Sequence, residues 1–369
     1  MAKPVPAAWG SEDEAKASSL LLERRRTDRR RRVAAPPTGV ERRLGDRRRQ
    51  TAGVAGAFLV ASALASPAMA RPPVRNPNPF AGAQLFVDPY SLAWQQADAW
   101  RSSRPADAIQ MDKIAAAAQA DWFGGWSGDI QSAVDSRVST IAGTGALPVL
   151  VAYNIPNRDC SGGYSAGGAA DDAAYRDWIR RFSLGIGGRR TVVVLEPDAL
   201  ADAANCGTAA IQQARLSLLF DAVSVLKADP AVAVYIDAGH SRWLPAGTAA
   251  ALLNAAGVSK ADGFALNVSN FNPTSGELAY GRAVSQQLGG KHFLVDTSRN
   301  GANVVPATWC NPSGMALGAR PTGETGDPVV DAYVWVKRPG ESDGTCNGGP
   351  SAGSFWPDYA LGLAQRSSS

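Results

Sequence analysis

The sequence predicts an α/β fold in which seven or eight parallel strands, covered by helices, form a closed or nearly closed barrel. Short apolar runs alternate along the chain with longer amphipathic or alanine-rich stretches, as strands and helices do around a parallel sheet. About 290 residues follow residue 79, which is enough for one large domain. A doubly wound open sheet is the alternative, but no Gly-x-Gly-x-x-Gly motif follows the first expected strand.

The expected strands are short runs of apolar and β-branched residues. In chain order they cover residues 84–87, 120–123, 147–153, 191–196, 232–237, 263–268, 292–296 and 332–336. The expected helices are the stretches at residues 92–102, 130–142, 170–183, 209–227, 247–256 and 277–288. Each of these helical stretches separates two strands, which is the connection that parallel strands need.

One strand ends abruptly. Residues 191–195 are Thr-Val-Val-Val-Leu, a composition typical of a strand that is buried on both faces. Pro197 stops the hydrogen-bond ladder, so Asp198 lies just past the carboxyl end of the strand. The simple interpretation is that Asp198 caps a helix beginning at Ala199. The residues at the other strand ends favour a reactive site instead.

Acidic, basic and aromatic residues follow the ends of several expected strands, and in a barrel these ends meet at one rim. The acids are Asp159, Asp198, Asp237 and Asp343, and their companions are Arg158, His240, Lys337, Tyr153, Trp243 and Trp309. Carboxylates beside exposed rings suit polysaccharide cleavage, because one carboxyl can stay protonated while flat rings stack on sugars. With His240 and His292 as the two histidines, a Ser-His-Asp triad has little material, and we expect His292 to be structural.

Basic residues concentrate at the amino terminus. Residues 1–50 carry 14 Lys or Arg and 7 Asp or Glu, whereas the rest carries 23 basic and 26 acidic residues, so no nucleic-acid binding is expected. The apolar run at residues 52–65, followed by Ala68-Met69-Ala70, indicates that residues 1–70 contain a secretory signal cleaved after Ala70. A retained membrane anchor is the weaker alternative, because the apolar run is short. Residues 71–79 are expected to form a loose leader before the domain at residues 80–369.

The exported part would contain four cysteines: Cys160, Cys206, Cys310 and Cys346. An even number in a secreted chain favours two disulfides, for which three pairings are possible. Pairing in sequence order would close the shortest loops. None of the cysteines has the spacing of zinc ligands, so no metal or other cofactor is expected.

Four motifs make the pattern specific. They are Tyr-Asn-Ile-Pro-Asn-Arg-Asp-Cys at residues 153–160, Val-Leu-Glu-Pro-Asp at 194–198, Tyr-Ile-Asp-Ala-Gly-His at 235–240 and Trp-Val-Lys-Arg-Pro-Gly-Glu-Ser-Asp-Gly at 335–344. Together they resemble glycoside hydrolase family 6, the inverting cellulases, and residues 267–271 and 309–312 resemble further family segments. The resemblance covers residues 80–364. It implies a distorted, incompletely closed barrel of about seven strands, with the active-site groove across the strand ends.

The resemblance also implies roles for the residues in these motifs. Asp198 resembles the general acid, and Asp159 the carboxylate that keeps this acid protonated or relays a proton from the attacking water. Tyr153 resembles the tyrosine that distorts the sugar, and Asp343 a second candidate base. The expected substrate-binding residues are Lys337, Glu341, Trp243, Trp309, Asn270, His240 and Asp237, the last with an electrostatic or structural role. The family's two disulfides match pairing in sequence order.

Two short segments distinguish modes of action within the family. Exo-acting cellobiohydrolases roof their groove with long loops, whereas residues 198–211 and 343–359 are brief here, and the latter segment is expected to be an exposed turn. The sequence therefore predicts a secreted, monomeric endo-β-1,4-glucanase that acts on a β-1,4-glucan or cello-oligosaccharides. A cellobiohydrolase of the same family is one alternative, and a non-catalytic glucan-binding protein is another.

Overall fold

The computed structural model describes residues 78–160 and 163–367. Seven strands form one sheet in the order β1 to β7, and every neighbouring pair is parallel. The strands are β1 (Asp121–Phe123), β2 (Val149–Ala152), β3 (Thr191–Leu195), β4 (Val232–Asp237), β5 (Gly263–Leu266), β6 (His292–Asp296) and β7 (Val330–Val334). The expected signal over residues 1–70, with most of the leader, lies outside the described residues.

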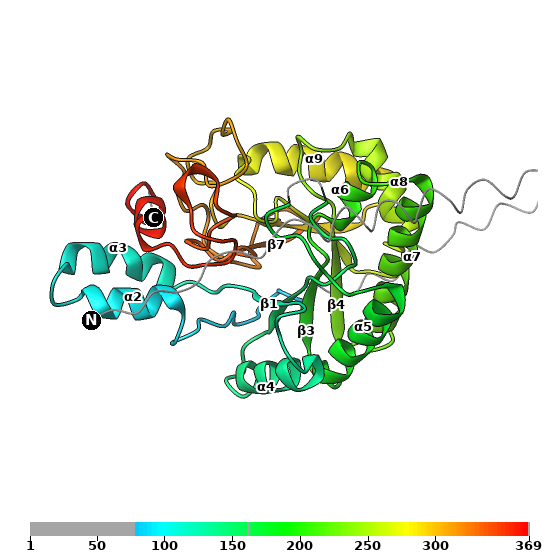
Figure 1. Ribbon diagram of the computed structural model, residues 1–369, viewed down its shortest axis with the longest axis horizontal. Helices are drawn as coiled ribbons and strands as arrows, with labels where there is room; N and C mark the ends of the chain where they lie inside the picture. Colours follow the sequence, from blue (N-terminus) through cyan, green and yellow to red (C-terminus); the bar gives the residue numbers. More distant parts are fainter. Residues whose placement is uncertain (1–77, 161–162, 368–369) are drawn as a thin grey trace, which may run out of the picture. The chain divides into compact units, whose positions relative to one another are not determined.

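Helices cover the outside of this sheet (Figure 1). Those that follow strands are α4 (Ile130–Ala142), α5 (Asp172–Ile186), α6 (Ala199–Ala203), α7 (Ala209–Leu226), α8 (Ala246–Ala255) and α9 (Thr274–Gln287). Three more, α2 (Leu92–Trp100), α3 (Pro105–Ala115) and α10 (Pro357–Gln365), pack together beside the carboxyl-terminal end of the chain (Figure 1). Within the described ranges, no helix combines the length and apolarity needed to cross a bilayer.

Both faces of the sheet are buried, which explains why the strands are continuous apolar runs. Leu150 and Val193 pack outward in one cluster with residues of the covering helices, including Tyr175 of α5. Val151 and Val194 point the other way and fill the inside of the curled sheet. The expected α/β fold with a parallel, barrel-like sheet is therefore confirmed.

The barrel is open between β1 and β7, where the sheet ends. Single hydrogen bonds join this gap: Ala120 N donates to Trp335 O at 3.0 Å, and Trp122 Nε1 donates to Val336 O at 2.8 Å. These bonds hold the segment after β7, which carries Lys337, beside the first strand. An incompletely closed barrel is thus confirmed as well.

One expectation about the elements needs correction. Residues 84–87 do not form a strand, since this segment makes an isolated parallel bridge from Leu85 to Leu147, and Val87 is exposed. The segment at residues 343–359 is largely the exposed turn that was expected, between buried Asp343 and the start of α10. The sequence pattern missed α3 and α10, whose buried faces pack on each other rather than on the sheet.

Candidate active site

A cleft of about 440 Å³ lies at the carboxyl ends of the strands. Its lining residues come from the loops that follow several strands, which is where parallel barrels place their reactive groups. They are Trp122, Tyr153, Asp159, Ser165, Asp198, His240, Arg242, Trp243, Ser269, Asn270, Trp309, Lys337 and Asp343.

Asp198 stands at the N-cap position of α6, yet its side chain makes no capping hydrogen bond. The simple interpretation from the sequence, a helix cap, is therefore wrong, and the carboxyl lines the cleft instead. The backbone is in the left-handed region at both Glu196 (φ 49°) and Asp198 (φ 70°). Such conformations cost about 1–3 kcal/mol each in residues with a side chain, and they concentrate at functional sites.

Buried carboxylates hold this turn in place. Asp198 N donates to Asp237 Oδ2 at 2.8 Å, and Gly239 N donates to the same oxygen at 3.2 Å. The Glu196 carboxylate accepts bonds of 3.0 Å from the backbone N–H groups of Asn154 and Ile155. The turn that bears Asp198 is thereby fixed to the ends of β2 and β4.

The surroundings of Asp198 favour the protonated form of its carboxyl. Burial, followed by the negative charges of Asp202, Asp159 and Asp343 and opposed by the charge of Lys337, raises the pKa of Asp198 to about 7. Like charges and desolvation both disfavour the ionised form. A carboxyl with a pKa near neutral pH has the property required of a general acid.

Asp159 and Tyr153 lie on the loop after β2. Ser165 N donates to Asp159 Oδ2 at 2.5 Å, and Asp159 has a left-handed backbone with φ 52°. The Tyr153 ring meets the Trp122 ring edge-on at 5.3 Å, while the guanidinium of Arg158 lies 4.8 Å from its centroid. Burial, followed by the charge of Asp198, raises the pKa of Tyr153, so its hydroxyl keeps its proton.

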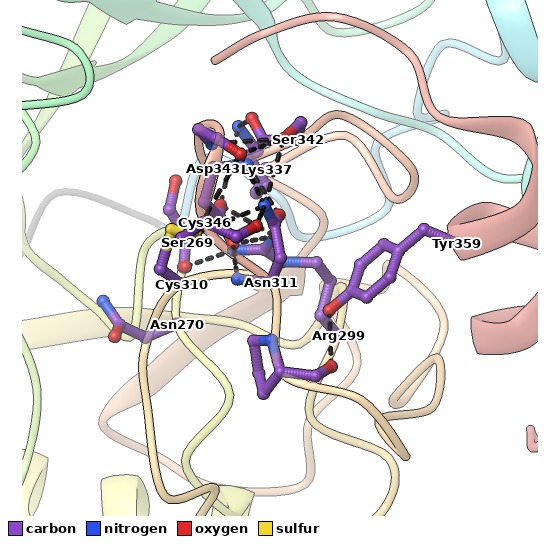
Figure 2. A network of polar contacts seen from close by, with 12 residues as sticks. Ser269, Asn270, Arg299, Cys310, Asn311, Lys337, Ser342, Asp343, Cys346 and Tyr359 are labelled. Atoms are coloured by element: carbon purple, nitrogen blue, oxygen red, sulfur yellow. Dashed lines mark hydrogen bonds and ion pairs between the residues drawn. A yellow bond between two sulfur atoms is a disulfide. The ribbon is translucent and has the colours of Figure 1, made fainter. Parts of the chain in front are cut away.

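Asp343 is fixed from several sides, as Figure 2 shows. Arg299 Nη1 lies 2.9 and 3.0 Å from the two carboxylate oxygens, and Asn311 N donates to Oδ2 at 3.0 Å. Lys337 Nζ is 3.9 Å from Oδ1. Since Arg299 is fully buried, its charge needs a buried partner, and Asp343 provides it.

The two disulfides pair the cysteines in sequence order, Cys160–Cys206 and Cys310–Cys346, and this expectation is confirmed. Each bridge lies next to a loop that carries an acid. Asp159 directly precedes Cys160, and Asp343 is held by Asn311, the neighbour of Cys310. The bridges therefore restrain the two loops that carry Asp159 and Asp343.

Aromatic rings line the cleft. Trp309 is 47% exposed and has Tyr164 edge-on at 5.9 Å, whereas Trp243 is half-buried beside His240, with ring centroids 5.5 Å apart. Burial, followed by the charge of Arg242, lowers the pKa of His240 to about 4, so this ring is neutral near pH 7. Exposed, preorganised rings of this kind are surfaces on which sugar rings can stack.

Two of the residues expected at the site lie elsewhere. Asp237 is 1% exposed and lies beneath the turn of Asp198, where it accepts backbone bonds. Glu341 lines a separate cavity of about 150 Å³ and pairs with Arg338 at 3.2 Å. The other expected catalytic and binding residues all line the main cleft.

The sequence interpretation missed four lining residues: Trp122, Ser165, Arg242 and Ser269. Trp122 carried a signal in the sequence, because it stands at the end of an expected strand and is followed by Gly124, Gly125 and a second tryptophan, Trp126. At Gly124 a Cβ would lie 2.7 Å from Tyr153 O, so glycine allows the Tyr153 loop to pack against β1. Ser269 lies in the segment at residues 267–271 that resembles the family, whereas Ser165 had no distinguishing pattern.

An open parallel barrel with carboxylates and indole rings along its strand-end cleft is the construction of a polysaccharide-hydrolysing enzyme. The chain matches the model of the Glycosyl hydrolases family 6 over residues 80–367, and it belongs to this family. The resemblance that the motifs indicate is therefore confirmed, and it places the protein among the glycoside hydrolases.

Named relatives agree with this assignment. Endoglucanase A of Cellulomonas fimi is 42% identical over 291 residues, which are 78% of this chain and 62% of that protein, so the chain spans less than two thirds of this relative. The probable 1,4-β-D-glucan cellobiohydrolase C of Neosartorya fischeri is 35% identical over 324 residues, covering 73% of this chain and 70% of that protein.

A solved structure is also similar. The endoglucanase Cel6 from Mycobacterium tuberculosis, in complex with methyl-cellobiosyl-4-deoxy-4-thio-β-D-cellobioside, has 44% sequence identity and a TM-score of 0.74. The match covers 79% of this chain and 99% of that one.

Proposed function

We propose that this protein is a secreted endo-β-1,4-glucanase that hydrolyses internal bonds of a β-1,4-glucan with inversion, using Asp198 as general acid. The observation that carries the proposal is the Asp198 carboxyl itself. It lines the cleft, caps no helix, and has a pKa of about 7 through burial and neighbouring carboxylates. The similarity to endoglucanases at 42% and 44% identity supports the substrate class.

In this mechanism the glucan chain lies along the cleft between Trp243 and Trp309. Asp198 gives its proton to the glycosidic oxygen as the bond from that oxygen to the anomeric carbon breaks. A water molecule attacks the anomeric carbon from the opposite face, and a carboxylate takes its proton. Tyr153, packed against Trp122, presses on the sugar ring at the point of cleavage.

The candidate bases differ in their environment. Both oxygens of Asp343 lie within hydrogen-bond distance of Arg299, and one of them also accepts a bond from Asn311 N. Asp159 lies on the same cleft and contributes to the raised pKa of Asp198. We therefore assign proton transfer from water to Asp159 and an electrostatic role to Asp343.

Endo action is tested by comparing two rates on carboxymethylcellulose. An endoglucanase lowers the viscosity quickly while few reducing ends appear. Slow loss of viscosity with cellobiose as the main early product would instead support the cellobiohydrolase alternative. Recording the anomeric configuration of the first products by NMR tests inversion, because a product that retains the β-configuration contradicts it.

We further propose that the enzyme is exported as a monomer and that residues 1–70 are removed as a signal. Residues 71–79 then form a leader, and residues 80–369 form the catalytic domain. The two disulfides support an oxidising compartment. Amino-terminal sequencing of protein from the culture medium tests the cleavage after Ala70. A mature chain that begins at any residue before Arg71 would contradict it.

A further inference from the structure

A buried ion pair lies directly behind the Asp198 turn. Asp202 on α6 is 1% exposed, and Arg215 on α7 is 4% exposed. Asp202 follows Asp198 by one helical turn, because Asp202 N donates to Asp198 O at 2.8 Å. Neither side chain lines the cleft, and the hydrolysis mechanism above assigns no role to them.

Arg215 connects two segments that each carry a site carboxyl. Its Nη2 donates to Asn157 O at 2.8 Å and lies 3.5 Å from Pro156 O, on the loop that bears Asp159. Its Nη1 is 3.8 Å from Asp202 Oδ2, on the helix that begins after Asp198. A single guanidinium thus touches both segments.

The Cys160–Cys206 disulfide joins the same two segments covalently. One carboxylate oxygen of Asp202 and the two sulfur atoms lie within 4.8 Å of one another. Because the sulfur atoms are bonded to each other, this group does not offer a metal the thiolates it would need. The carboxylate faces the disulfide and the guanidinium instead, with Cys160 Sγ 3.6 Å from Asp202 Oδ2.

Stability alone does not account for such a pair. A buried ion pair often contributes less than well-packed apolar residues of similar volume, because both charges lose their hydration. Among the described residues Arg215 Nη1 also has no hydrogen-bond partner, so the guanidinium is not fully satisfied there. A buried ion pair that adds little to stability and lies beside the Asp198 turn points to a role in the reaction.

The charges around Asp198 indicate what this role is. After burial, the carboxylate of Asp202 is the first cause of the raised pKa of Asp198. The other charged or titratable groups near Asp198 are Asp159 and Tyr153 after β2, Glu196 after β3, Asp237 at the end of β4, and Lys337 and Asp343 after β7. Asp202 is close in sequence and on a rigid helix, so its distance from the acid is fixed.

We propose that Asp202 and Arg215 are positioning residues of the hydrolysis: Asp202 supplies a fixed negative charge that keeps the proton on Asp198, and Arg215 holds the Asp159 loop against the Asp198 helix. This inference rests on the proposed function of Asp198. The role of Asp202 is electrostatic and the role of Arg215 is geometric, so separate variants can test the two parts.

Asp202→Asn removes the charge and preserves the size of the side chain. The alkaline limb of the pH profile of kcat/KM reports loss of the acid's proton in the free enzyme. Without the neighbouring carboxylate Asp198 ionises more easily, so this limb moves to lower pH by roughly 0.5–1 pH unit. The measurement is hydrolysis of a soluble cello-oligosaccharide between pH 4 and pH 9.

Arg215→Lys keeps the positive charge but replaces the planar fork with a single ammonium. We expect kcat to fall by roughly 10-fold or more, because the Asp159 loop loses its guanidinium donor and small misplacements cost activity. The alkaline limb stays within about 0.2 pH unit of the parent, since the charge next to Asp202 is retained.

The matched control is a pair of the same residue types that joins α5 to α7. Arg176 Nη1 lies 2.9 Å from Asp221 Oδ2, away from the cleft. Asp221→Asn and Arg176→Lys should change neither the alkaline limb nor kcat.

The outcomes separate this proposal from the one it rests on. If Asp198→Ala remains active on an unactivated glucan, the proposed function fails. If Asp198 is essential but the limb of folded Asp202→Asn coincides with that of the parent, the electrostatic part is overturned. Parental kcat in Arg215→Lys overturns the geometric part. If Asp202→Asn does not fold, Asp202→Ser, which also removes the charge, takes its place in the pH profile.

Discussion

At Asp198 the position in the helix suggests a capping residue, but the side-chain contacts leave the carboxyl free for chemistry in the cleft. Asp198 takes the N-cap position of α6, where aspartate is common because its side chain usually accepts a backbone N–H. Here the side chain makes no such bond, and the backbone N–H of Asp198 is itself bound by Asp237. The stabilisation that a cap would give is absent, and the carboxyl is available to the cleft.

The first prediction concerns Asp198→Ala. We expect turnover on an unactivated glucan to fall by at least about 10²–10⁴-fold, because this is the usual contribution of general acid catalysis. Binding of a cello-oligosaccharide should be largely retained, since alanine removes no ring or cation of the cleft. Steady-state kinetics and calorimetric titration measure the two effects. Loss of binding together with loss of turnover would indicate a collapsed cleft rather than a missing acid.

The second prediction concerns Trp243→Ala. Its indole is half-buried against the His240 ring, so it is held ready to stack on a sugar. We expect the affinity for cello-oligosaccharides to fall by roughly 1–3 kcal/mol, the range found for other stacking aromatic side chains. Calorimetry on the Asp198→Ala background measures binding without hydrolysis. Trp178→Ala on the outside of the barrel, packed against Phe182, serves as control and should leave the affinity unchanged.

At the scale of elements, the loop between β4 and α8 is held by two buried acids. Asp237 binds its beginning through Gly239 N. Glu277 of α9 binds its middle, since Ser241 N lies 3.1 and 3.2 Å from the two carboxylate oxygens and Ser241 Oγ donates at 2.7 Å. This loop carries Trp243, so α9 determines where one wall of the cleft stands.

The third prediction follows from this anchor. Glu277→Ala leaves the Ser241 donors without their acceptor, which should raise KM several-fold and destabilise the protein by about 1–3 kcal/mol. Glu277→Gln retains an acceptor oxygen and should keep KM close to the parent value. Kinetics on a soluble cello-oligosaccharide distinguish the two variants. Equal KM values for both variants would contradict the role of Glu277 in placing the loop.

Local sequence pattern was sufficient for much of the architecture. The strand at residues 191–195 is apolar, short and ended by a proline, so its position and burial follow from its composition. The strand-end acids followed from the rule that carboxyl ends of parallel strands converge. The helices α3 and α10 did not follow, because their buried faces contact each other across about 250 residues of sequence.

The residues of the candidate site also fall into those that sequence motifs predict and those that only the fold places. Asp159, Asp198 and Asp343 lie in motifs and were found, whereas Ser165 reaches the cleft through a loop conformation that no pattern encodes. Glu341 lies in the same motif as Lys337, yet the loop turns it into another cavity beside Arg338. Spacing identifies the loop that reaches a site, but the turn within the loop decides which side chain faces it.

At the scale of the whole molecule, several carboxyl groups lie in the interior without a matching charge. Burial raises the pKa of Glu196 and of Glu277 to about 7, and it raises that of Asp237 and Asp296 as well. Backbone N–H groups hydrogen-bond to Glu196 and Asp296 and offset part of this effect. The fold therefore tolerates buried acids around the cleft as well as at Asp198, which lines it.

The fourth prediction is that the free energy of unfolding falls as pH rises from about 4.5 to about 7. A carboxyl whose pKa is raised on folding binds its proton more tightly in the folded state, so its contribution is present below the unfolded pKa and is lost as pH rises through the folded one. For Glu277 these values are 4.5 and about 7. Its share is on the order of 2–3 kcal/mol. Urea unfolding at pH 5 and pH 8 measures the difference.

Glu277→Gln provides the internal test of this prediction, because glutamine accepts the Ser241 bonds and does not titrate. The variant should lose part of the difference between pH 5 and pH 8 and be more stable than the parent at pH 8. A parent protein that is equally stable at both values, or a variant with the parent's full pH dependence, would show that Glu277 is ionised at little cost. In that case the tolerance of the fold for buried acids would come from solvation inside the barrel rather than from protonation.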